Sequence, residues 1–314
     1  MPQRQSLTIV IAAFNEEASL PEMHRRLGDV LDSLEAQASV LYVDDGSRDG
    51  TWGVLQALAA EDGRVQLLRL ARNFGKELAL TAGLDHVDTD AALVLDADGQ
   101  DPPELIPAFV AKWREGYDVV YGTRTRRDGE SWLKRFTAAA FYRVMSRLSP
   151  TPIPADTGDF RLMSRPVLDA LRQLRERQRF MKGLFTWVGY RQVSLPYERA
   201  PRLAGGSKFN YWRLWNLALE GITSFSTVPL RLATYVGVLT ALVAFAWGLW
   251  IVARTVLWGD PVQGWPSLMT VMLFLGGVQL VALGIIGEYL GRLYLEVKQR
   301  PLYLVAEARL PPAL

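Results

Sequence analysis

The stretch ALVLDADGQDPPE, residues Ala92 to Glu104, passes from an apolar run directly into carboxylates and prolines. Asp96 and Asp98 are two residues apart, so in an extended chain their side chains face the same way, and Gln100 continues the row. Oxygen ligands of this kind, without sulfur or imidazole, suit Mg²⁺ or Mn²⁺. Because an Asp-x-Asp pair is also common on solvated loops, this stretch alone does not identify a metal site, and its surroundings in the fold have to be considered.

Apolar runs alternate with amphipathic stretches through roughly residues 1–205. The expected strands are Leu7–Ala12, Val40–Val43, Val65–Leu70, Ala92–Leu95 and Asp118–Tyr121, and the stretches Glu17–Ser33, Gly50–Ala60 and Lys76–His86 are expected to be helices. This alternation predicts an α/β domain with a mainly parallel sheet covered by helices. Ligands of such sheets bind beyond the carboxyl ends of the strands, so the residues that follow each strand are the candidates for chemistry.

Charged residues follow each of these expected strands. In chain order they are Glu16, the pair Asp44 and Asp45, Arg72 with Lys76, Asp96 with Asp98, and Arg124. One edge of the sheet therefore collects carboxylates and cations, a combination that suits a metal-bound diphosphate. Neither the GxGxxG dinucleotide fingerprint nor the GxxxxGK[ST] phosphate loop is present. The absence of cysteine excludes thiolate nucleophiles and thiolate metal sites.

Two long apolar runs occupy the last third of the chain. The first has 22 residues without a charge between Arg231 and Arg254, and the core of the second is Ser267 to Gly287. At about 1.5 Å per residue each run spans roughly 30 Å, the thickness of the hydrocarbon core of a bilayer. We expect a transmembrane hairpin at 231–288, with spans at about 232–253 and 267–287, although two buried helices of a soluble protein would give a similar pattern.

Cations flank the expected hairpin on one side. Lys208, Arg213 and Arg231 precede it and Arg292, Lys298 and Arg300 follow it, whereas the connection between the two spans has one Arg and one Asp. By the positive-inside rule, both the N-terminal domain and the C-terminal tail at 289–314 lie in the cytoplasm. We expect the tail to return to this domain or to a neighbouring subunit. The segments 131–148 and 206–230 mix aromatic residues with cations and are expected to lie at the membrane interface.

Motifs along nearly the whole chain resemble the inverting GT-A glycosyltransferases of family 2 that act on polyprenyl phosphates, related to dolichyl-phosphate mannose synthase and bactoprenol glucosyltransferase. The matching segments are IVIAAFNEE, VDDGSRDGT, RNFGKELALTAGLD, DADGQDPPEL, YGTR, TGDFRLM, RFMKGL, GGSKFNYWRLWNLA and GEYLGRLYLEVKQRPLYLV. The resemblance is closest to bacterial members with a two-helix hairpin. It implies a Rossmann-like GT-A domain at 1–205 in the cytoplasm, anchored in the inner (plasma) membrane as a multi-pass protein.

The resemblance also implies roles for individual residues. Ala12, Asn15, Glu16, Asp44 and Asp45 match the nucleoside pocket, with Lys76 nearby; Asp98, Gln100 and Asp96 match the metal-binding segment; and Arg124, Arg202, Ser207 and Lys208 match positions that grip phosphate groups. Asp159 in TGDFR is expected to align the acceptor or to deprotonate it. Two alternatives stay open, namely a tight turn with a helix cap at Asp44-Asp45-Gly46-Ser47 and a basic loop that binds lipid headgroups around Lys208.

The implied reaction transfers glucose from UDP-glucose to undecaprenyl phosphate with Mg²⁺ or Mn²⁺, inverts the anomeric carbon and releases UDP. A mannose synthase that uses GDP-mannose, a transferase for a modified UDP-pentose and a membrane-bound polysaccharide synthase are alternatives within the same fold. A catalytically silent membrane anchor is the alternative of a different class. Nucleic acid is not expected as a partner, because the aromatic residues cluster by the hairpin rather than along an open basic face. A homo-oligomer is compatible with the resemblance.

Overall fold

The computed structural model of the chain describes residues 5–125, 157–177, 179–198, 200, 228–259 and 264–310. The strands are β1 (Ser6–Ala13), β2 (Gln37–Asp44), β3 (Val65–Leu70), β4 (Ala91–Asp96), β5 (Val119–Arg124), β6 (Thr157–Ser164), β7 (Gln192–Tyr197) and β8 (Val305–Arg309). The helices are α1 (Leu20–Ser33), α2 (Thr51–Glu61), α3 (Lys76–Asp85), η1 (Pro103–Leu105), α4 (Ile106–Arg114), α6 (Arg165–Gln173), α7 (Met181–Trp187), α9 (Val228–Trp258) and α10 (Trp265–Val297). The five strands and three helices expected in the N-terminal part are present, with ends shifted by at most three residues.

The strands of the described chain form one sheet in the order β7-β5-β6-β4-β1-β2-β3-β8. β1 to β4 are parallel to one another, whereas β6 is antiparallel to both of its neighbours and β8 is antiparallel to β3. The predicted mainly parallel α/β sheet is thus confirmed. The chain runs outward from β1 to β3 and then crosses back to place β4 on the other side of β1. The strand order therefore reverses between β1 and β4, which is where open α/β sheets bind their ligands.

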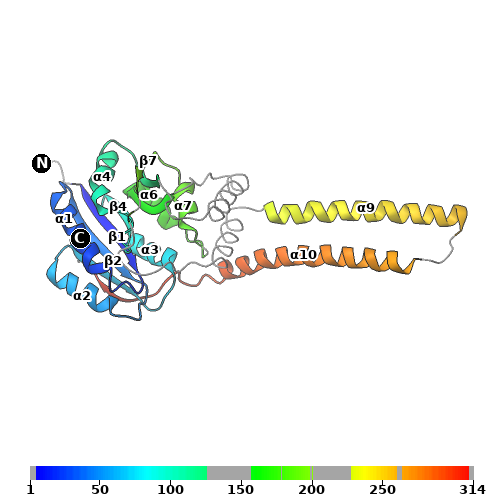
Figure 1. Cartoon of the computed structure of the whole chain (residues 1–314), viewed down its shortest axis with the longest axis horizontal. Coiled ribbons are helices and arrows are strands. Elements are labelled where there is room, and N and C mark those ends of the chain that lie inside the picture. Colours follow the sequence, from blue (N-terminus) through cyan, green and yellow to red (C-terminus); the bar gives the residue numbers. More distant parts are fainter. Residues whose placement is uncertain are drawn as a thin grey trace.

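Helices cover both faces of this sheet (Figure 1). Ile9 and Ile11 of β1 belong to the apolar cluster on the side of α1 and α4, whereas Val10 belongs to the cluster on the side of α3 and α6. A strand that is covered on both faces needs apolar residues at consecutive positions, and the run from Leu7 to Ile11 provides them except for Thr8. The same rule explains why β4 reads as a continuous apolar run.

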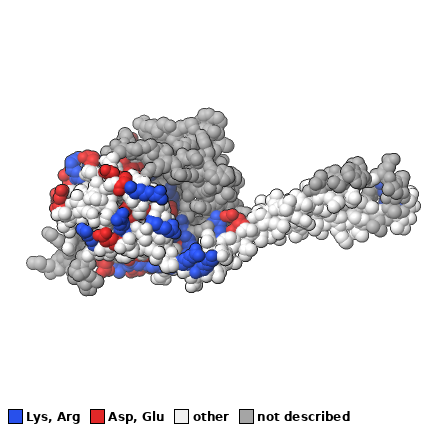
Figure 2. Space-filling view, turned by 90° about the horizontal axis from the view of Figure 1, so that it is seen from below, with Lys and Arg blue, Asp and Glu red and all other residues white. Residues whose placement is uncertain are grey.

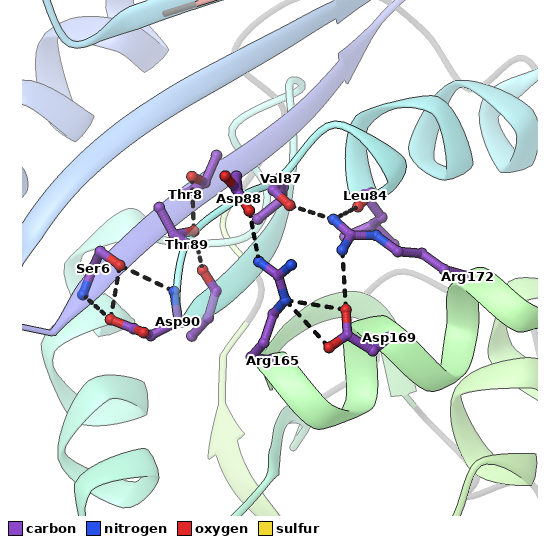
Figure 3. A network of polar contacts seen from close by, with 11 residues as sticks. Ser6, Thr8, Leu84, Val87, Asp88, Thr89, Asp90, Arg165, Asp169 and Arg172 are labelled. Carbon is purple, nitrogen blue, oxygen red and sulfur yellow. Dashed lines mark hydrogen bonds and ion pairs between the residues drawn. The ribbon is translucent and has the colours of Figure 1, made fainter. Parts of the chain in front are cut away.

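Ion pairs brace the amino-terminal edge of the sheet, away from the carboxyl ends of β1 and β4 (Figure 3). Arg165, at the start of α6, contacts Asp88 and Asp169 at 3.0 Å each. The backbone N–H and the hydroxyl of Ser6 both donate to Asp90 at 2.8 Å. Because these groups are exposed, each pair contributes at most about 1 kcal/mol. They hold α6 and the beginnings of β1 and β4 together.

α9 and α10 run side by side away from the sheet domain (Figure 1). With 31 and 33 residues they are about 46 Å and 50 Å long at 1.5 Å per residue. They contain the apolar spans Leu232–Trp258 and Phe274–Val297, neither of which is buried within the chain. The two spans expected at about 232–253 and 267–287 lie within these helices. Figure 2 shows Lys and Arg, together with Asp or Glu, where the hairpin joins the sheet domain, while the described helix surface beyond is almost entirely uncharged in this view.

The C-terminal tail returns to the domain from which the hairpin extends. β8 pairs with β3 in antiparallel register, with Leu68 opposite Ala308, and the N–H of Ala71 donates to the carbonyl of Leu304 at 2.8 Å. The tail was expected to pack on its own sheet domain or on a neighbouring subunit, and in the structure it packs on its own domain. Both ends of the hairpin consequently lie on the same side of any membrane that it crosses.

Candidate active site

Lys76 connects two carboxylates that are far apart in the sequence. Its ammonium lies 2.6 Å from Oδ1 of Asp96, at the end of β4, and 2.6 Å from Oδ2 of Asp159, in β6. Lys76 is the first residue of α3, and Gly75 before it has a φ of 97°, a conformation that favours glycine. The structure thus brings together Asp96, predicted to bind the metal, and Asp159, predicted to align the acceptor, at the carboxyl edge of the sheet.

The charges of this bridge stabilise each other. Burial opposes the negative charge of Asp159, but Lys76 and Lys182 outweigh it and hold the pKa of this carboxyl well below its usual range. Loss of water likewise opposes the charge of Lys76, and the carboxylates of Asp159 and Asp96 nevertheless raise its pKa. Because the Lys76 side chain is 46% exposed, water still screens the bridge. Both partners are charged at neutral pH.

Glu77 links the start of α3 to α7. Its Oε2 accepts a hydrogen bond of 3.0 Å from the backbone N–H of Met181. Burial and the neighbouring Asp159 raise the pKa of Glu77 to about 7. Neither Glu77 nor Lys182 was among the residues predicted for the site. Lys182 belongs to the RFMKGL motif, which is a signal that sequence reasoning had available.

The loop after β4 folds around a buried carboxylate. Asp98 Oδ1 accepts from the N–H of Gln100 at 3.1 Å, so these two predicted metal ligands lie in one turn. Asp101 is fully buried and accepts a short hydrogen bond from the hydroxyl of Tyr197 in β7. Arg124 lies close to the same pair, with its Nε 3.3 Å from the Tyr197 hydroxyl. Asp101 and Tyr197 therefore position the loop and Arg124, a role that the sequence did not indicate.

The chain after β7 lies beside this loop. The N–H of Ala200 donates to the carbonyl of Gln100 at 3.0 Å. The predicted phosphate-binding residues Arg202, Ser207 and Lys208 lie outside the described residues. So do the expected interfacial segment 131–148 and most of the one expected at 206–230, of which only 228–230 are described, as the start of α9. Among the predicted cations, the structure therefore brings Lys76 and Arg124 to the site.

The residues predicted for the nucleoside pocket lie where β1 and β2 end. Ala12 pairs with Asp96 across the β1–β4 register, at the point where the strand order reverses. Asn15 has a φ of 54°; its N–H donates to Ser47 Oγ at 3.0 Å, and its Oδ1 accepts from the N–H of Arg48 at 2.9 Å. The backbone N–H of Glu16 donates to the Thr51 hydroxyl at 2.9 Å. These contacts join the two strand ends into one rigid edge beside Asp96.

Asp44 and Asp45 have local partners. Asp44 is fully buried; its Oδ1 accepts from the N–H of Ser47 at 3.0 Å, and its Oδ2 lies 3.2 Å from Arg69 Nε. Asp45 accepts from the N–H groups of Phe74 and Gly75 at 2.7 and 2.9 Å. Burial raises the pKa of Asp45, although the two N–H donors oppose the shift. The tight turn considered for Asp44 is present, whereas the start of α2 is held by Asp49 instead. Contact of either carboxylate with a nucleoside stays a prediction.

The oxygen donors after β4 fit a hard divalent cation. Among the residues that the structure describes, no group of three or more His, Asp or Glu side chains could hold a metal by itself. Mg²⁺ is commonly held by one or two carboxylates together with phosphate oxygens of a substrate and water. Asp96 and Asp98 supply two such carboxylates, so a cation bound here would need further ligands from a phosphorylated substrate.

Comparisons with known proteins assign the two parts of the chain. The family model "Glycosyl transferase family 2" matches residues 8–172, and the model "GtrB C-terminal hairpin" matches residues 228–293. The chain is 52% identical to an uncharacterized glycosyltransferase of Synechocystis over 96% of this chain and 95% of the relative. It is 46% identical to the SfII prophage-derived bactoprenol glucosyl transferase of Shigella flexneri, over 96% and 98% of the two chains.

Among solved structures, the chain is similar to glucosyl-3-phosphoglycerate synthase from Mycobacterium tuberculosis in complex with Mn²⁺, UDP-glucose and phosphoglyceric acid. The two are 21% identical with a TM-score of 0.47, over 70% of this chain and 78% of that one. The predicted family is confirmed by the family models and by the near full-length relatives. The hairpin model and the two apolar helices also indicate association with a membrane. The chain belongs to glycosyl transferase family 2 and is a glycosyltransferase with a C-terminal hairpin.

Proposed function

We propose that this enzyme transfers glucose from UDP-glucose to undecaprenyl phosphate, inverts the anomeric carbon and releases UDP. The observation that carries the proposal is the bridge from Asp96 through Lys76 to Asp159, because it joins the segment predicted to bind the donor to the segment predicted to bind the acceptor. Support for the lipid acceptor comes from the relatives named bactoprenol glucosyl transferase, which align with nearly the whole chain, hairpin included.

The residues of the site divide into a donor side and an acceptor side. Ala12, Asn15 and Glu16, at and after the end of β1, would bind the nucleoside on the donor side, and Arg124 of β5 would contact the diphosphate. Arg202, Ser207 and Lys208 would complete the grip on the phosphates. The divalent cation, Mg²⁺ or Mn²⁺, would be held by Asp96, Asp98 and Gln100 and would stabilise negative charge on the departing diphosphate.

Asp159 aligns the acceptor in this proposal. Its low pKa leaves it unprotonated, and its Oδ2 is already paired with Lys76. A lipid phosphate has a second pKa of about 6 and is largely a dianion at neutral pH, so its oxygen needs positioning more than deprotonation. The site therefore works by fixing the acceptor oxygen near the anomeric carbon and by electrostatic stabilisation of the leaving group.

The hairpin anchors this site at the inner membrane. We propose that α9 and α10 cross the bilayer and that residues 1–205 and the tail at 289–314 are cytoplasmic, with an interfacial helix at 206–230. The pairing of β8 with β3 supports this arrangement, since it requires both segments to be on one side. The cations at the base of the hairpin favour the cytoplasmic side.

The proposal is tested with the purified full-length chain in detergent and a panel of radiolabelled UDP-glucose, GDP-mannose and a UDP-pentose. Undecaprenyl phosphate and the phosphate-free undecaprenol serve as paired acceptors, with Mg²⁺, Mn²⁺ or a chelator. We expect labelled lipid only from UDP-glucose, undecaprenyl phosphate and a metal. Labelled lipid from GDP-mannose alone would identify a mannose synthase, and no lipid product with any donor would refute the lipid acceptor.

A further inference from the structure

Lys182 is held at the site by the packing of α7. Met181 before it is fully buried, donates its N–H to Glu77 and lies with its sulfur 3.7 Å from the Thr81 hydroxyl of α3. Phe185, one turn further along α7, is buried beneath Arg161 of β6, whose guanidinium carbon is 4.0 Å from the ring centroid. α7 is thus fixed between α3 and β6, the two elements that carry Lys76 and Asp159.

The Lys182 ammonium has no direct anionic partner among the described residues. Asp159 is the carboxylate that most favours the charge of Lys182, but its Oδ2 is already paired with Lys76 at 2.6 Å. Among the residues within the described ranges, none forms an ion pair or hydrogen bond with the Lys182 ammonium. Loss of water lowers the pKa of Lys182, helped by the like charges of Lys76 and Arg124 and opposed by the carboxylates of Asp159 and Glu77. A half-buried ammonium in such surroundings is stabilised when an anion binds.

We propose that Lys182 binds the phosphate of the polyprenyl phosphate acceptor. This inference rests on the proposed function and adds a residue to it. Two observations favour the acceptor phosphate over the donor diphosphate. α7 packs through Phe185 on Arg161 of β6, the strand that carries Asp159, and α7 lies on the side of the sheet domain that faces the hairpin (Figure 1).

The chemistry of a lipid phosphate matches this position. A phosphate oxygen would give the Lys182 ammonium a direct anionic partner, which Asp159 does not provide because its Oδ2 is paired with Lys76. The ammonium offers three donors on a flexible stem, so it can follow a phosphate that enters from the membrane side. Phosphate-free polyprenol would bring no such compensation and would leave Lys182 desolvated.

The test measures binding to the full-length chain in detergent, without donor, so that it does not depend on transfer. The probes are undecaprenyl phosphate and undecaprenol, and the variants are Lys182→Gln, Lys182→Met and Lys182→Arg. Lys112→Gln is the matched control, because Lys112 lies on α4 and pairs only with Glu115 of the same segment. We expect Lys182→Gln and Lys182→Met to bind undecaprenyl phosphate at least about tenfold more weakly, as the loss of a charge-assisted hydrogen bond implies.

We further expect Lys182→Arg to retain most of the affinity, Lys112→Gln to match the wild type, and the affinity for UDP-glucose to stay within about twofold in every variant. Removing an uncompensated charge should also leave the unfolding temperature unchanged or raised, whereas a purely structural lysine would lower it. Equal binding of undecaprenyl phosphate by wild type and Lys182→Gln would overturn this inference alone. A loss confined to UDP-glucose would assign Lys182 to the donor and also overturn it. A wild type without preference for the phosphorylated lipid would overturn the proposed function as well.

Discussion

Gly158→Ala tests whether the position of Arg124 matters for catalysis. A Cβ atom at residue 158 would lie 2.8 Å from Nη2 of Arg124 and 3.5 Å from its Cζ, whereas ordinary contact begins at 3.4 Å. The guanidinium would therefore have to retreat by about 0.6 Å. Among the described residues, its polar contacts are long, 3.3 Å to the hydroxyl of Tyr197 and 3.9 Å to Asp101, so a flexible side chain can make this movement.

The expected effect on activity is larger than the effect on stability. A misplacement of about 1 Å in a positioning group can lower the rate about a hundredfold, so a shift of this size should lower kcat/KM for UDP-glucose by roughly tenfold. The free energy of unfolding should change by less than about 1 kcal/mol, because the arginine yields and the alanine restricts the unfolded chain.

The assay compares initial rates of lipid glycosylation and thermal unfolding of the detergent-solubilised chain for wild type, Gly158→Ala and Gly53→Ala. Gly53 is an exposed position in α2 with nothing near its added Cβ, so Gly53→Ala should keep full activity and be slightly more stable. Full activity in Gly158→Ala would show that Arg124 does not have to occupy its observed position. A large loss of stability would show that the arginine cannot yield.

Three further changes probe the bridge, the buried acid and the tail. Lys76→Gln should lower kcat/KM by at least about a hundredfold, because Asp159 loses the counter-charge at 2.6 Å and is no longer bridged to Asp96. Near wild-type activity would contradict the role of this bridge. The pKa of Glu77 is about 7 in the folded chain and has the ordinary value of 4.5 in the unfolded chain. Between pH 4.5 and about 7 the folded chain therefore binds more protons, and its free energy of unfolding falls as the pH rises. Glu77→Gln should flatten that part of a plot of unfolding temperature against pH, and an unchanged slope would assign the titration to another group. Ending the chain after Arg300 removes β8 and leaves β3 as an open edge of the sheet. We expect a lower unfolding temperature and aggregation on size-exclusion chromatography. Unchanged behaviour would show that the tail is dispensable.

Local patterns were enough to predict the central strands and the hairpin. Ile9 to Ala12 and Ala92 to Leu95 read as buried strands because helices cover both faces of a parallel sheet. The hairpin follows from the length and composition of its two apolar runs. The polar residues after β1, β2 and β4 do gather at one edge, since parallel strands end at the same side of a sheet.

Long-range pairings were beyond the reach of the sequence. Thr157–Ser164 was identified only as a motif, yet it forms β6, buried along its whole length between β4 and β5. Lys76 was predicted to lie near the nucleoside pocket. Its position in the sequence gives no indication that its side chain contacts Asp159 of β6. Asp44 and Asp45 follow a strand like the other candidates, but their carboxylates are engaged by Ser47, Arg69 and the turn before α3. Apart from the local contact of Asp44 with Ser47, these contacts join residues far apart in the sequence, and periodicity carries no information about them.

The most direct test of the central claim is single-turnover transfer of labelled glucose from UDP-glucose to undecaprenyl phosphate with Mg²⁺, for the wild type and Asp98→Ala. We expect labelled lipid from the wild type and a loss of at least about a hundredfold in the variant, whose fold is checked by its unfolding temperature. Equal transfer by the folded variant would contradict the assignment of the site to the loop after β4. No transfer by the wild type would contradict the proposed reaction itself.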